Sequence, residues 1–148
     1  MNQKMEKGLT LPEILVVIAI ILILGVVSVP VLSRIAPHYR LTGASRELVS
    51  ALRETQSLAV TKQYNHITRF IPESQSYSII RVVDGNEEPE GTINLPRQIT
   101  VTNITLPNNQ VIFTSSGAPQ NSGTLQLNNN LGETITIEVT PSGQIKSY

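Results

Sequence analysis

The chain has 148 residues and a mass of 16.2 kDa, enough for one domain and a tail but too little for two independent cores. Eleven basic residues balance eleven acidic ones, and this zero net charge argues against a dedicated nucleic-acid binder. The sequence has no cysteine, which excludes disulfides, cysteine zinc sites and thiol nucleophiles. Two histidines leave few groups for acid–base or metal chemistry, so we expect neither an enzyme nor a cofactor.

A long apolar segment follows a short basic stretch at the N-terminus. Residues 14–33 contain no charged side chain. An α-helix needs about 20 apolar residues to cross a bilayer, so we predict a single membrane-spanning helix here. After residue 33 the sequence becomes rich in Thr, Asn, Ser and Gln with alternating apolar residues, which is typical of a soluble domain.

The apolar segment does not fit a cleaved secretory signal peptide, whose hydrophobic region covers about 7 to 15 residues. No pair of small residues suited to a signal peptidase lies between Ser28 and Ala36. An uncleaved signal anchor that holds a non-polymerising extracytoplasmic domain stays open as an alternative. It leaves Glu13 unexplained, because a carboxylate beside an apolar membrane segment is costly unless it finds a partner or reaches the interface.

The residues just before the apolar segment form a second pattern. Thr10 and Glu13 have the spacing of a capping box, and Pro12 lies in the first turn, where its missing N–H does no harm. Capping alone accounts for Thr10 and Pro12. Glu13 then either marks the interfacial end of the helix or takes part in a contact with another molecule.

The run from Gly8 to Glu13, Gly-Leu-Thr-Leu-Pro-Glu, is followed at once by the apolar helix and resembles the processing motif of type IV pilins and pseudopilins. In that family a prepilin peptidase cuts after the glycine on the cytoplasmic side and methylates the new N-terminal amine. The resemblance implies a cleaved leader of residues 1–8, a cut after Gly8 and a methylated Leu9. Leu9 stands where the family usually has phenylalanine, and Pro12 where it usually has an aliphatic residue.

The resemblance also implies that residues 9–33 form a transmembrane and assembly helix, with Thr10, Leu11 and Glu13 in the assembly motif. Within a bundle of such helices, Glu13 pairs with the N-terminal amine of a neighbouring subunit. The cost of an unpaired buried charge then favours correct docking. Basic residues flank the segment on both sides, so charge alone leaves its orientation undecided, whereas the family places the leader inside the cell.

The family further implies a location and a set of partners. The protein is expected in the inner (cytoplasmic) membrane as a single-pass subunit, with its C-terminal domain periplasmic or extracytoplasmic. The implied partners are prepilin peptidase, other pilin or pseudopilin subunits, the inner-membrane assembly platform and membrane lipid.

Residues 34–148 form the predicted extracytoplasmic domain, which begins with a helix at about residues 41–62. Its apolar and small residues recur at three- and four-residue spacing, which predicts one buried stripe: Leu41, Ala44, Leu48, Ala51, Leu52, Thr55 and Ala59. Pro37 and Gly43 predict a bend or a looser stretch where this helix joins the apolar one.

Residues 66–148 are predicted to be rich in β-structure. Alternation is clearest in residues 134–140, where Ile135, Ile137 and Val139 share one face. Further strands are expected at residues 67–71, 77–83, 99–105, 111–114, 124–127 and 144–148, with turns such as Asp84-Gly85 between them. The predicted fold class is α+β, with a long N-terminal membrane-spanning helix continuing into an amphipathic helix that packs on small antiparallel sheets.

This order of elements resembles the H-type minor pseudopilins of type II secretion and the related minor type IV pilins. In the C-terminal half the resemblance rests on residues 111–113 followed by Gly117, on the strand at 135–139 and on Gly143-Gln144-Ile145. It implies a structural subunit that assembles into a pseudopilus or a type IV pilus.

Charge is unevenly distributed along the predicted domain. Residues 34–62 carry five positive and two negative side chains, whereas residues 63–148 carry four positive and seven negative ones. One interpretation is a pair of solvated surfaces. The other is attraction between stacked subunits of complementary charge.

Three further patterns in the sequence also have simpler explanations. The acidic residues of segment 84–90 are consistent with a calcium site or with a solvated loop after an Asp-Gly turn. His38 and His66 have no acidic residue at metal-ligand spacing, which favours surface or packing roles and no metal site. Capture of DNA by a minor pilin is the alternative function, but the distal half offers only four basic residues among seven acids: Arg69, Arg81, Arg97 and Lys146.

Overall fold

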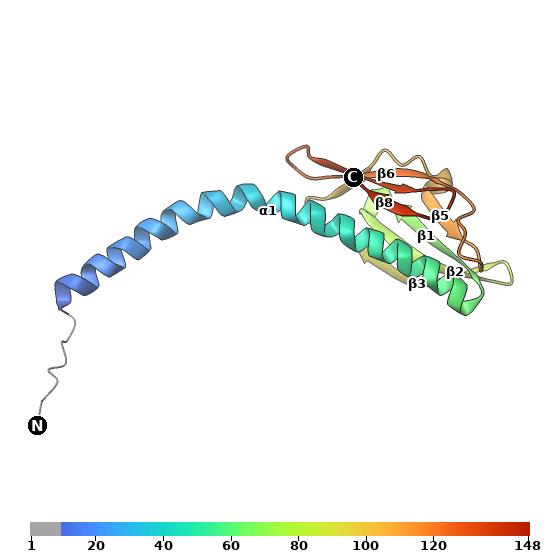
Figure 1. Ribbon diagram of the computed structural model, residues 1–148, viewed down its shortest axis with the longest axis horizontal. Helices are drawn as coiled ribbons and strands as arrows, with labels where there is room; N and C mark the ends of the chain where they lie inside the picture. The colour runs from blue at the N-terminus through green and yellow to red at the C-terminus, as the bar shows by residue number, and fades with distance from the viewer. Residues whose placement is uncertain (1–9) are drawn as a thin grey trace, which may run out of the picture. The chain divides into compact units, whose positions relative to one another are not determined.

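The structure is a computed structural model that describes the backbone of residues 10–148 and the side chains of residues 10–26 and 35–148. The predicted leader, with Gly8, and Leu9 lie outside the described residues. The chain divides into two compact units, of which the first ends at Ala36 and the second covers Pro37–Tyr148. Helix α1 (Leu11–Lys62, 52 residues) supplies the first unit and opens the second (Figure 1).

The N-terminal unit begins with the turn that the sequence predicts. The carbonyl oxygen of Thr10 accepts hydrogen bonds from the N–H groups of Glu13 and Ile14, at 3.1 and 3.2 Å, so helical bonding starts directly after Thr10. Pro12 is the second residue of α1, where no N–H is needed. Glu13 lies in the first turn, where a negative charge is favourable because the helix dipole is positive there.

Apolar side chains cover α1 on all sides from Ile14 to Val26. The large apolar residues from Leu11 to Val26 are between 47% and 77% exposed, so none of them is packed in a core. The predicted span, residues 14–33, lies partly outside the described side chains. Among the residues that are described, no helix combines the length and the apolar character needed to cross a membrane.

Helix α1 continues through Pro37 and Gly43 without a break in its helical assignment. A single proline is compatible with this because it removes only one hydrogen bond of the ladder. The bend or looser stretch that the sequence predicts between Pro37 and Gly43 is compatible with a helix that continues through both residues, and it stays a prediction.

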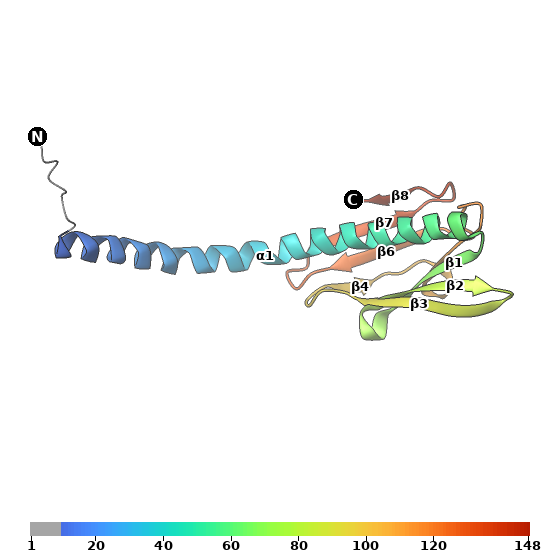
Figure 2. The ribbon, with the colours of Figure 1, turned by 90° about the horizontal axis from the view of Figure 1, so that it is seen from below.

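The second unit contains two antiparallel four-stranded sheets, with strand orders β3-β2-β1-β5 and β4-β6-β7-β8 (Figures 1 and 2). The first sheet consists of β1 (Asn65–Ile71), β2 (Ser76–Val83), β3 (Asn86–Asn94) and β5 (Gln110–Phe113). The second consists of β4 (Thr100–Thr102), β6 (Gly123–Asn128), β7 (Thr134–Val139) and β8 (Ile145–Ser147). Two short 3₁₀ helices, Pro72–Ser74 and Pro107–Asn109, complete the unit. The α+β class and the antiparallel sheets are therefore confirmed.

The core of this unit lies between α1 and the two sheets. Every residue of the predicted buried stripe is at most 6% exposed, and the stripe also includes Ser45. It packs against apolar residues of both sheets, among them Phe113, Leu125 and Ile137. Two buried hydroxyl groups in this interface are both hydrogen-bonded. Thr68 Oγ1 donates to Thr55 Oγ1 at 2.9 Å, and Thr55 Oγ1 donates to the carbonyl of Ala51.

Strand β3 is the main element that the sequence interpretation missed. Residues 86–94 contain glutamates, Pro89 and Gly91, a composition that is depleted in strands and favours a loop. β3 lies at the edge of its sheet, where a proline is tolerated, and it pairs with β2 around a register shift between Ile79 and Ile80. The sequence predicts only the Asp84-Gly85 turn that precedes this strand.

Strand β4 is shorter than predicted. It covers Thr100–Thr102 instead of residues 99–105. Asn103 has a φ of 47°, in the left-handed region, and this conformation cannot continue a strand. The apolar residues that suggested a longer strand, Val101 and Ile99, are nevertheless buried in the core.

Candidate functional site

The candidate assembly site is the first turn of α1. Thr10 directly precedes the helix and its carbonyl accepts the first helical hydrogen bonds, Leu11 is the first helical residue, and the exposed Glu13 follows directly after Pro12. The structure therefore brings together three of the five predicted site residues, namely Thr10, Leu11 and Glu13. The predicted cut between Gly8 and Leu9 falls outside the described residues.

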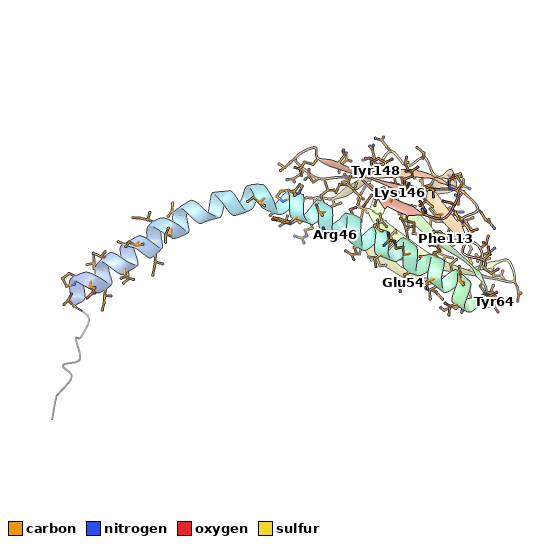
Figure 3. All side chains as sticks on the ribbon, viewed as in Figure 1. Arg46, Glu54, Tyr64, Phe113, Lys146 and Tyr148 are labelled. Carbon is orange, nitrogen blue, oxygen red and sulfur yellow. The ribbon has the colours of Figure 1, made fainter. Side chains whose placement is uncertain are left out.

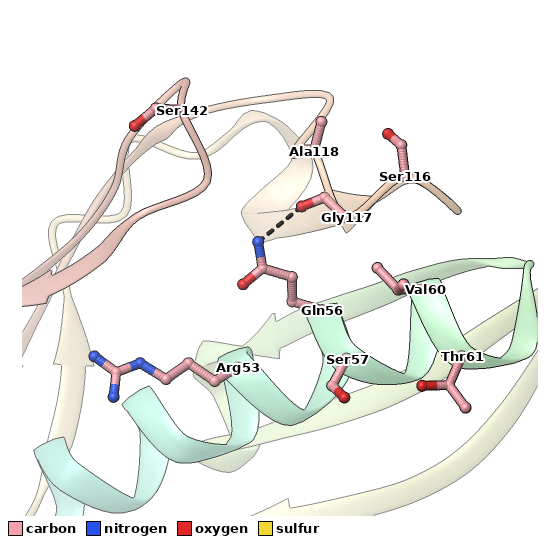
Figure 4. A pocket seen from close by; sticks show the side chains of 9 residues that line it. All are labelled: Arg53, Gln56, Ser57, Val60, Thr61, Ser116, Gly117, Ala118 and Ser142. Carbon is pink, nitrogen blue, oxygen red and sulfur yellow. Dashed lines mark hydrogen bonds between the residues drawn. The ribbon is translucent and has the colours of Figure 1, made fainter.

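A glutamine on α1 anchors two turns of the sheet region (Figure 4). Gln56 Nε2 donates hydrogen bonds to the carbonyl of Gly117 at 2.7 Å and to that of Gly143 at 3.3 Å. Gly117 follows β5, and Gly143 lies in the turn between β7 and β8, so one side chain joins α1 to both sheets. Figure 4 shows the amide of Gln56 pointing from the helix toward the Gly117 turn.

Both glycines need their backbone freedom, because Gly117 has a φ of +82° and Gly143 one of +81°. Space is also restricted at both. A Cβ on Gly117 would lie 2.9 Å from Val60 Cγ2, and one on Gly143 would lie 3.0 Å from Gln56 Nε2. Close contact with α1 therefore explains the two glycines that stand out in the C-terminal half of the sequence.

Two adjoining grooves lie on either side of Gln56, with volumes of about 560 and 540 Å³. Arg53 and Gln56 line both of them. The first groove is completed by the turns at Gly117 and Ser142, and the second by Ile145 and neighbouring residues. Both grooves are lined mostly by polar side chains and turn backbone. Such a lining suits a protein surface contact better than an apolar ligand.

The acidic residues of segment 84–90 are divided between the two faces of the first sheet. Glu87 forms a two-pronged ion pair with Arg69 of β1, with N–O distances of 2.7 and 2.9 Å. Glu88 pairs with Arg81, its direct neighbour on β2, and Glu90 pairs with Lys62 at 2.6 Å. Each of these three glutamates therefore contacts a cation from another element.

Four members of these ion pairs have shifted pKa values: Glu87, Glu90, Arg69 and Arg81. The hydrogen bond from Arg69 lowers the pKa of Glu87 below its ordinary value, and that from Lys62 does the same to the pKa of Glu90. The hydrogen bond to Glu87 raises the pKa of Arg69, and the hydrogen bond to Glu88 raises the pKa of Arg81. The carboxylates of Glu87 and Glu90 are thus held in their charged forms by protein cations.

This arrangement corrects the interpretation of segment 84–90. Neither the calcium site nor the solvated loop describes it, because β3 occupies most of the segment and Glu87, Glu88 and Glu90 are paired with basic side chains. Within the described part of the chain, no group of three His, Asp or Glu residues is placed to hold a metal ion.

The two histidines have different surroundings. His66 is completely buried; its Nδ1 donates to the carbonyl of Tyr64 at 2.9 Å, and its Nε2 lies 3.7 Å from Glu90 Oε2. It is a packing residue at the junction of α1 and the first sheet. His38 lies at the surface, with its Nδ1 3.4 Å from Glu133 Oε2.

Two family models match this sequence. The model of type II transport protein GspH matches residues 44–143, which is more than half of the chain. The chain belongs to the GspH family. The model of the prokaryotic N-terminal methylation motif matches residues 3–29, the stretch that contains the predicted processing site and the start of the apolar helix. This GspH-family chain is accordingly a minor pseudopilin or pilin subunit.

Solved structures show the same fold in other proteins of this kind. The minor pseudopilin EpsH from the type 2 secretion system of Vibrio cholerae has a TM-score of 0.63 at 12% identity, over 74% of this chain and 96% of that one. The type IV minor pilin FimU of Pseudomonas aeruginosa has a TM-score of 0.61 at 18% identity, over 75% and 90%. GspH of E. coli has a TM-score of 0.55 at 14% identity, over 74% and 88%. No curated protein sequence gives a significant match.

The GspH match covers the features that the sequence interpretation missed. Residues 44–143 contain the Gln56 anchor, both anchored glycines and the paired acids of β3. The sequence offered a signal for Gly117 and Gly143, since glycine among turn residues marks unusual backbone. It offered none for Gln56, whose role depends on two turns that lie 61 and 87 residues away.

Proposed function

We propose that this GspH-family chain is a membrane-anchored minor subunit whose apolar helix inserts among those of other subunits in a pseudopilus or pilus. The observation that carries the proposal is the apolar surface of α1 from Ile14 to Val26, which lies within the match to the methylation motif over residues 3–29. Such a surface, apolar on every side, requires burial against lipid or against other helices. The folded unit beginning at Pro37 is then the part displayed outside the inner membrane.

Processing by a prepilin peptidase precedes assembly. The cut falls between Gly8 and Leu9, removes the basic leader and leaves Leu9 with a methylated amine. The match to the methylation motif over residues 3–29 supports this step. Cleavage matters physically because it creates a positive N-terminal amine four residues before Glu13.

Glu13 supplies the specific contact in this assembly. Its carboxylate lies in the first turn of an apolar helix, where no basic side chain of the described helix lies within one turn of it. The N-terminal amine of a neighbouring subunit is the cation that assembly would bring to it. An unpaired charge in an apolar bundle is costly, so the pair favours one axial register over slipped ones.

We infer that the filament is a secretion pseudopilus, because the family is described as a type II transport protein. A type IV pilus is the alternative, supported by the shared fold of the minor pilin FimU. Besides prepilin peptidase, the partners are other pilin-type subunits, the inner-membrane assembly platform and lipid. The subunit acts as a structural component and not as an enzyme.

Capture of DNA receives less support from the charges of the domain. Two of the four basic residues in the distal half, Arg69 and Arg81, are engaged by glutamates. Arg97 and Lys146 are left, which is a small footprint for binding a phosphate backbone.

The proposal is tested by measuring how much of the Glu13→Gln variant enters filaments. The full-length chain is expressed with its secretion or pilus genes, and sheared filaments are probed for the subunit. We expect normal membrane levels and processing but at least a roughly tenfold loss from the filament fraction, because one unpaired charge is left in the bundle. Glu73→Gln, an exposed glutamate of the folded unit, is the matched control. Equal incorporation of Glu13→Gln and wild type would contradict the proposed role.

A further inference from the structure

Four strands form the edges of the two sheets: β3 and β5 in the first sheet, and β4 and β8 in the second. An edge strand presents main-chain N–H and C=O groups that no neighbouring strand satisfies. Such groups can pair with an extended segment of another chain, which then adds to the sheet as a further strand. The four edges of this protein differ in how its own residues treat these groups.

Residues of the same chain close the edges at β5 and β4. The N–H of Ile112 donates to Asn121 Oδ1 at 3.0 Å, and the carbonyl of Ile112 accepts from the N–H of Gln120 at 2.8 Å. On β4, the N–H of Val101 donates to Gln75 Oε1 at 2.7 Å. These outward groups of β5 and β4 are therefore already satisfied.

The edge at β3 is protected by its composition. Pro89 has no N–H to donate. Glu87, Glu88 and Glu90 place charges along the same strand. Prolines and charged side chains on an edge strand discourage pairing with another chain. β3 is therefore a poor site for an added strand.

Strand β8 forms the outer edge of the second sheet and keeps its outward main-chain groups open (Figure 2). Thr136 and Tyr148 exchange two main-chain hydrogen bonds, of 2.8 and 3.0 Å. Residues of an antiparallel pair alternate between bonding the partner strand and facing away from it, so Ile145 and Ser147 direct their N–H and C=O groups away from β7. Within the described residues, these outward groups receive one long hydrogen bond, of 3.5 Å, from Arg53 Nη2 to the carbonyl of Ile145.

Two basic side chains border this open edge. Arg53 of α1 and Lys146 of β8 line the groove of about 540 Å³, and Figure 3 labels Lys146 on its strand. Neither side chain forms an ion pair within the part of the chain that the structure describes. Lys146 has Glu138 as its direct neighbour on β7, whereas no acidic residue lies three or four positions from Arg53 on α1. Arg53 is therefore the cation available to an arriving strand.

We infer that an extended segment of a different, neighbouring subunit adds to β8 as a further strand of the second sheet, with an acidic side chain of that segment on Arg53. The N–H and C=O groups of Ile145 and Ser147 supply the main-chain hydrogen bonds, and Arg53 supplies the preference for an acidic sequence. The strand comes from another kind of subunit, because this chain is a minor component. The inference rests on the proposed function, which places other pilin-type subunits beside this chain.

Hydrogen exchange tests the added strand. The full-length chain is compared alone in detergent and within sheared filaments, and its C-terminal peptide is fragmented so that single amides are measured. The N–H groups of Ile145 and Ser147 should exchange at least about tenfold more slowly in filaments, because each gains a hydrogen bond. The N–H of Tyr148, already bonded to the carbonyl of Thr136 at 3.0 Å, is the internal control and should change less.

A proline at position 147 tests the main-chain hydrogen bond itself. Ser147→Pro removes the outward N–H, whereas Ser147→Ala keeps the N–H and removes only the hydroxyl. Since β7 does not use this N–H, both variants should unfold at the wild-type urea concentration. Ser147→Pro should lower the amount of subunit in the filament fraction roughly three- to tenfold, and Ser147→Ala should not. Equal incorporation of the two variants would count against the added strand.

Charge reversal tests the acidic character of the partner. Arg53→Glu should lower the filament fraction roughly three- to tenfold, because two acidic side chains would then face one another. Arg97→Glu, a reversal in the segment between β3 and β4, is the matched control and should leave the fraction unchanged. If the two reversals have the same effect, the acidic partner is wrong.

The outcomes separate this inference from the proposed function. Absence of the wild-type chain from filaments would contradict the proposed function. If the chain enters filaments while Ile145 and Ser147 exchange as fast as in detergent, assembly stands and the added strand is wrong. Slow exchange of both amides in a concentrated solution of the chain alone would mean that a second copy supplies the strand, and it would overturn the inferred partner.

Discussion

The amide of Gln56 donates a 2.7 Å hydrogen bond to the carbonyl of Gly117 and thereby fastens helix α1 to the turn that follows β5. The same nitrogen lies 3.3 Å from the carbonyl of Gly143, in the turn between β7 and β8. One side chain thus holds the two sheets to the helix that continues from the assembly segment. The contact needs one turn from each sheet, Gly117 after β5 and Gly143 between β7 and β8.

Gln56→Ala should destabilise the folded unit. The change leaves two partly buried carbonyl groups without their donor, which costs about 1–2 kcal/mol. Urea unfolding of the detergent-solubilised chain, followed by circular dichroism, measures the change. Gln120→Ala replaces an exposed glutamine whose side chain makes no hydrogen bond within the described residues, and it should alter stability by less than about 0.5 kcal/mol. Equal stability of the two variants would contradict the anchoring role.

Gly117→Ala should cost more than a positive φ alone explains. Its new Cβ would lie 2.9 Å from Val60 Cγ2, whereas Gly85, with the same φ of +82°, has open space around it. We expect Gly85→Ala to lose about 1 kcal/mol and Gly117→Ala about 2–3 kcal/mol in unfolding free energy. Adding Val60→Ala to Gly117→Ala should recover part of the difference. No recovery would show that the methyl contact is not the cause.

Acid should weaken the first sheet. The pKa values of Glu87 and Glu90 are lowered in the folded chain by hydrogen bonds from Arg69 and Lys62. Such groups stabilise the fold above their unfolded pKa of about 4.3, and this stability is lost as the pH falls through the folded value. The unfolding free energy measured from pH 7 to pH 3 should therefore fall below about pH 4.5.

The variants Glu87→Gln and Glu90→Gln should reduce that acid dependence. Each removes a titrating carboxylate, so the stability of the variant should change less between pH 4.5 and pH 3. Glu73→Gln, whose side chain makes no ion pair within the described residues, serves as the control and should keep the wild-type slope. A wild-type slope in all three variants would exclude the ion pairs as its source.

Alkali should weaken the core at Tyr77. Burial raises the pKa of this phenol to about 12, with smaller contributions from Glu47 and Glu54. The unfolded tyrosine ionises near pH 10, so the stability that its neutral form provides is complete below that pH and is lost as the pH rises through the folded value of about 12. Tyr77→Phe should flatten the decline in stability from pH 10 to pH 12, and Tyr148→Phe, at an exposed position, should not. Absorbance of the tyrosinate provides a second readout of the same titration.

The helical part of the fold could be predicted because its signal is local. Leu41, Leu48 and Leu52 recur with the period of a helix, and burial of one stripe follows from that period. Strand β7 was equally clear, since Ile135, Ile137 and Val139 alternate. Strand β3 could not be predicted, because its residues lie at an exposed sheet edge and carry charges instead of an alternating apolar face.

The contacts between distant residues could not be predicted from the sequence. The pairing of Glu87 with Arg69 depends on β3 and β1 lying in one sheet, with β2 between them. The role of Gln56 depends in the same way on turns that only the tertiary fold brings to the helix. The N-terminal site was the opposite case, since its residues are contiguous and resemble a known motif.

The central claim is that this GspH-family chain enters a filament as a processed subunit, and intact-mass analysis of the membrane-extracted protein tests it most directly. The protein is made with and without an active prepilin peptidase, and its N-terminal peptide is sequenced. We expect a mature chain that begins at methylated Leu9 only when the peptidase is active. A chain that keeps Met1 to Gly8 in both cases, or one that is cut beyond the apolar segment, would contradict the account.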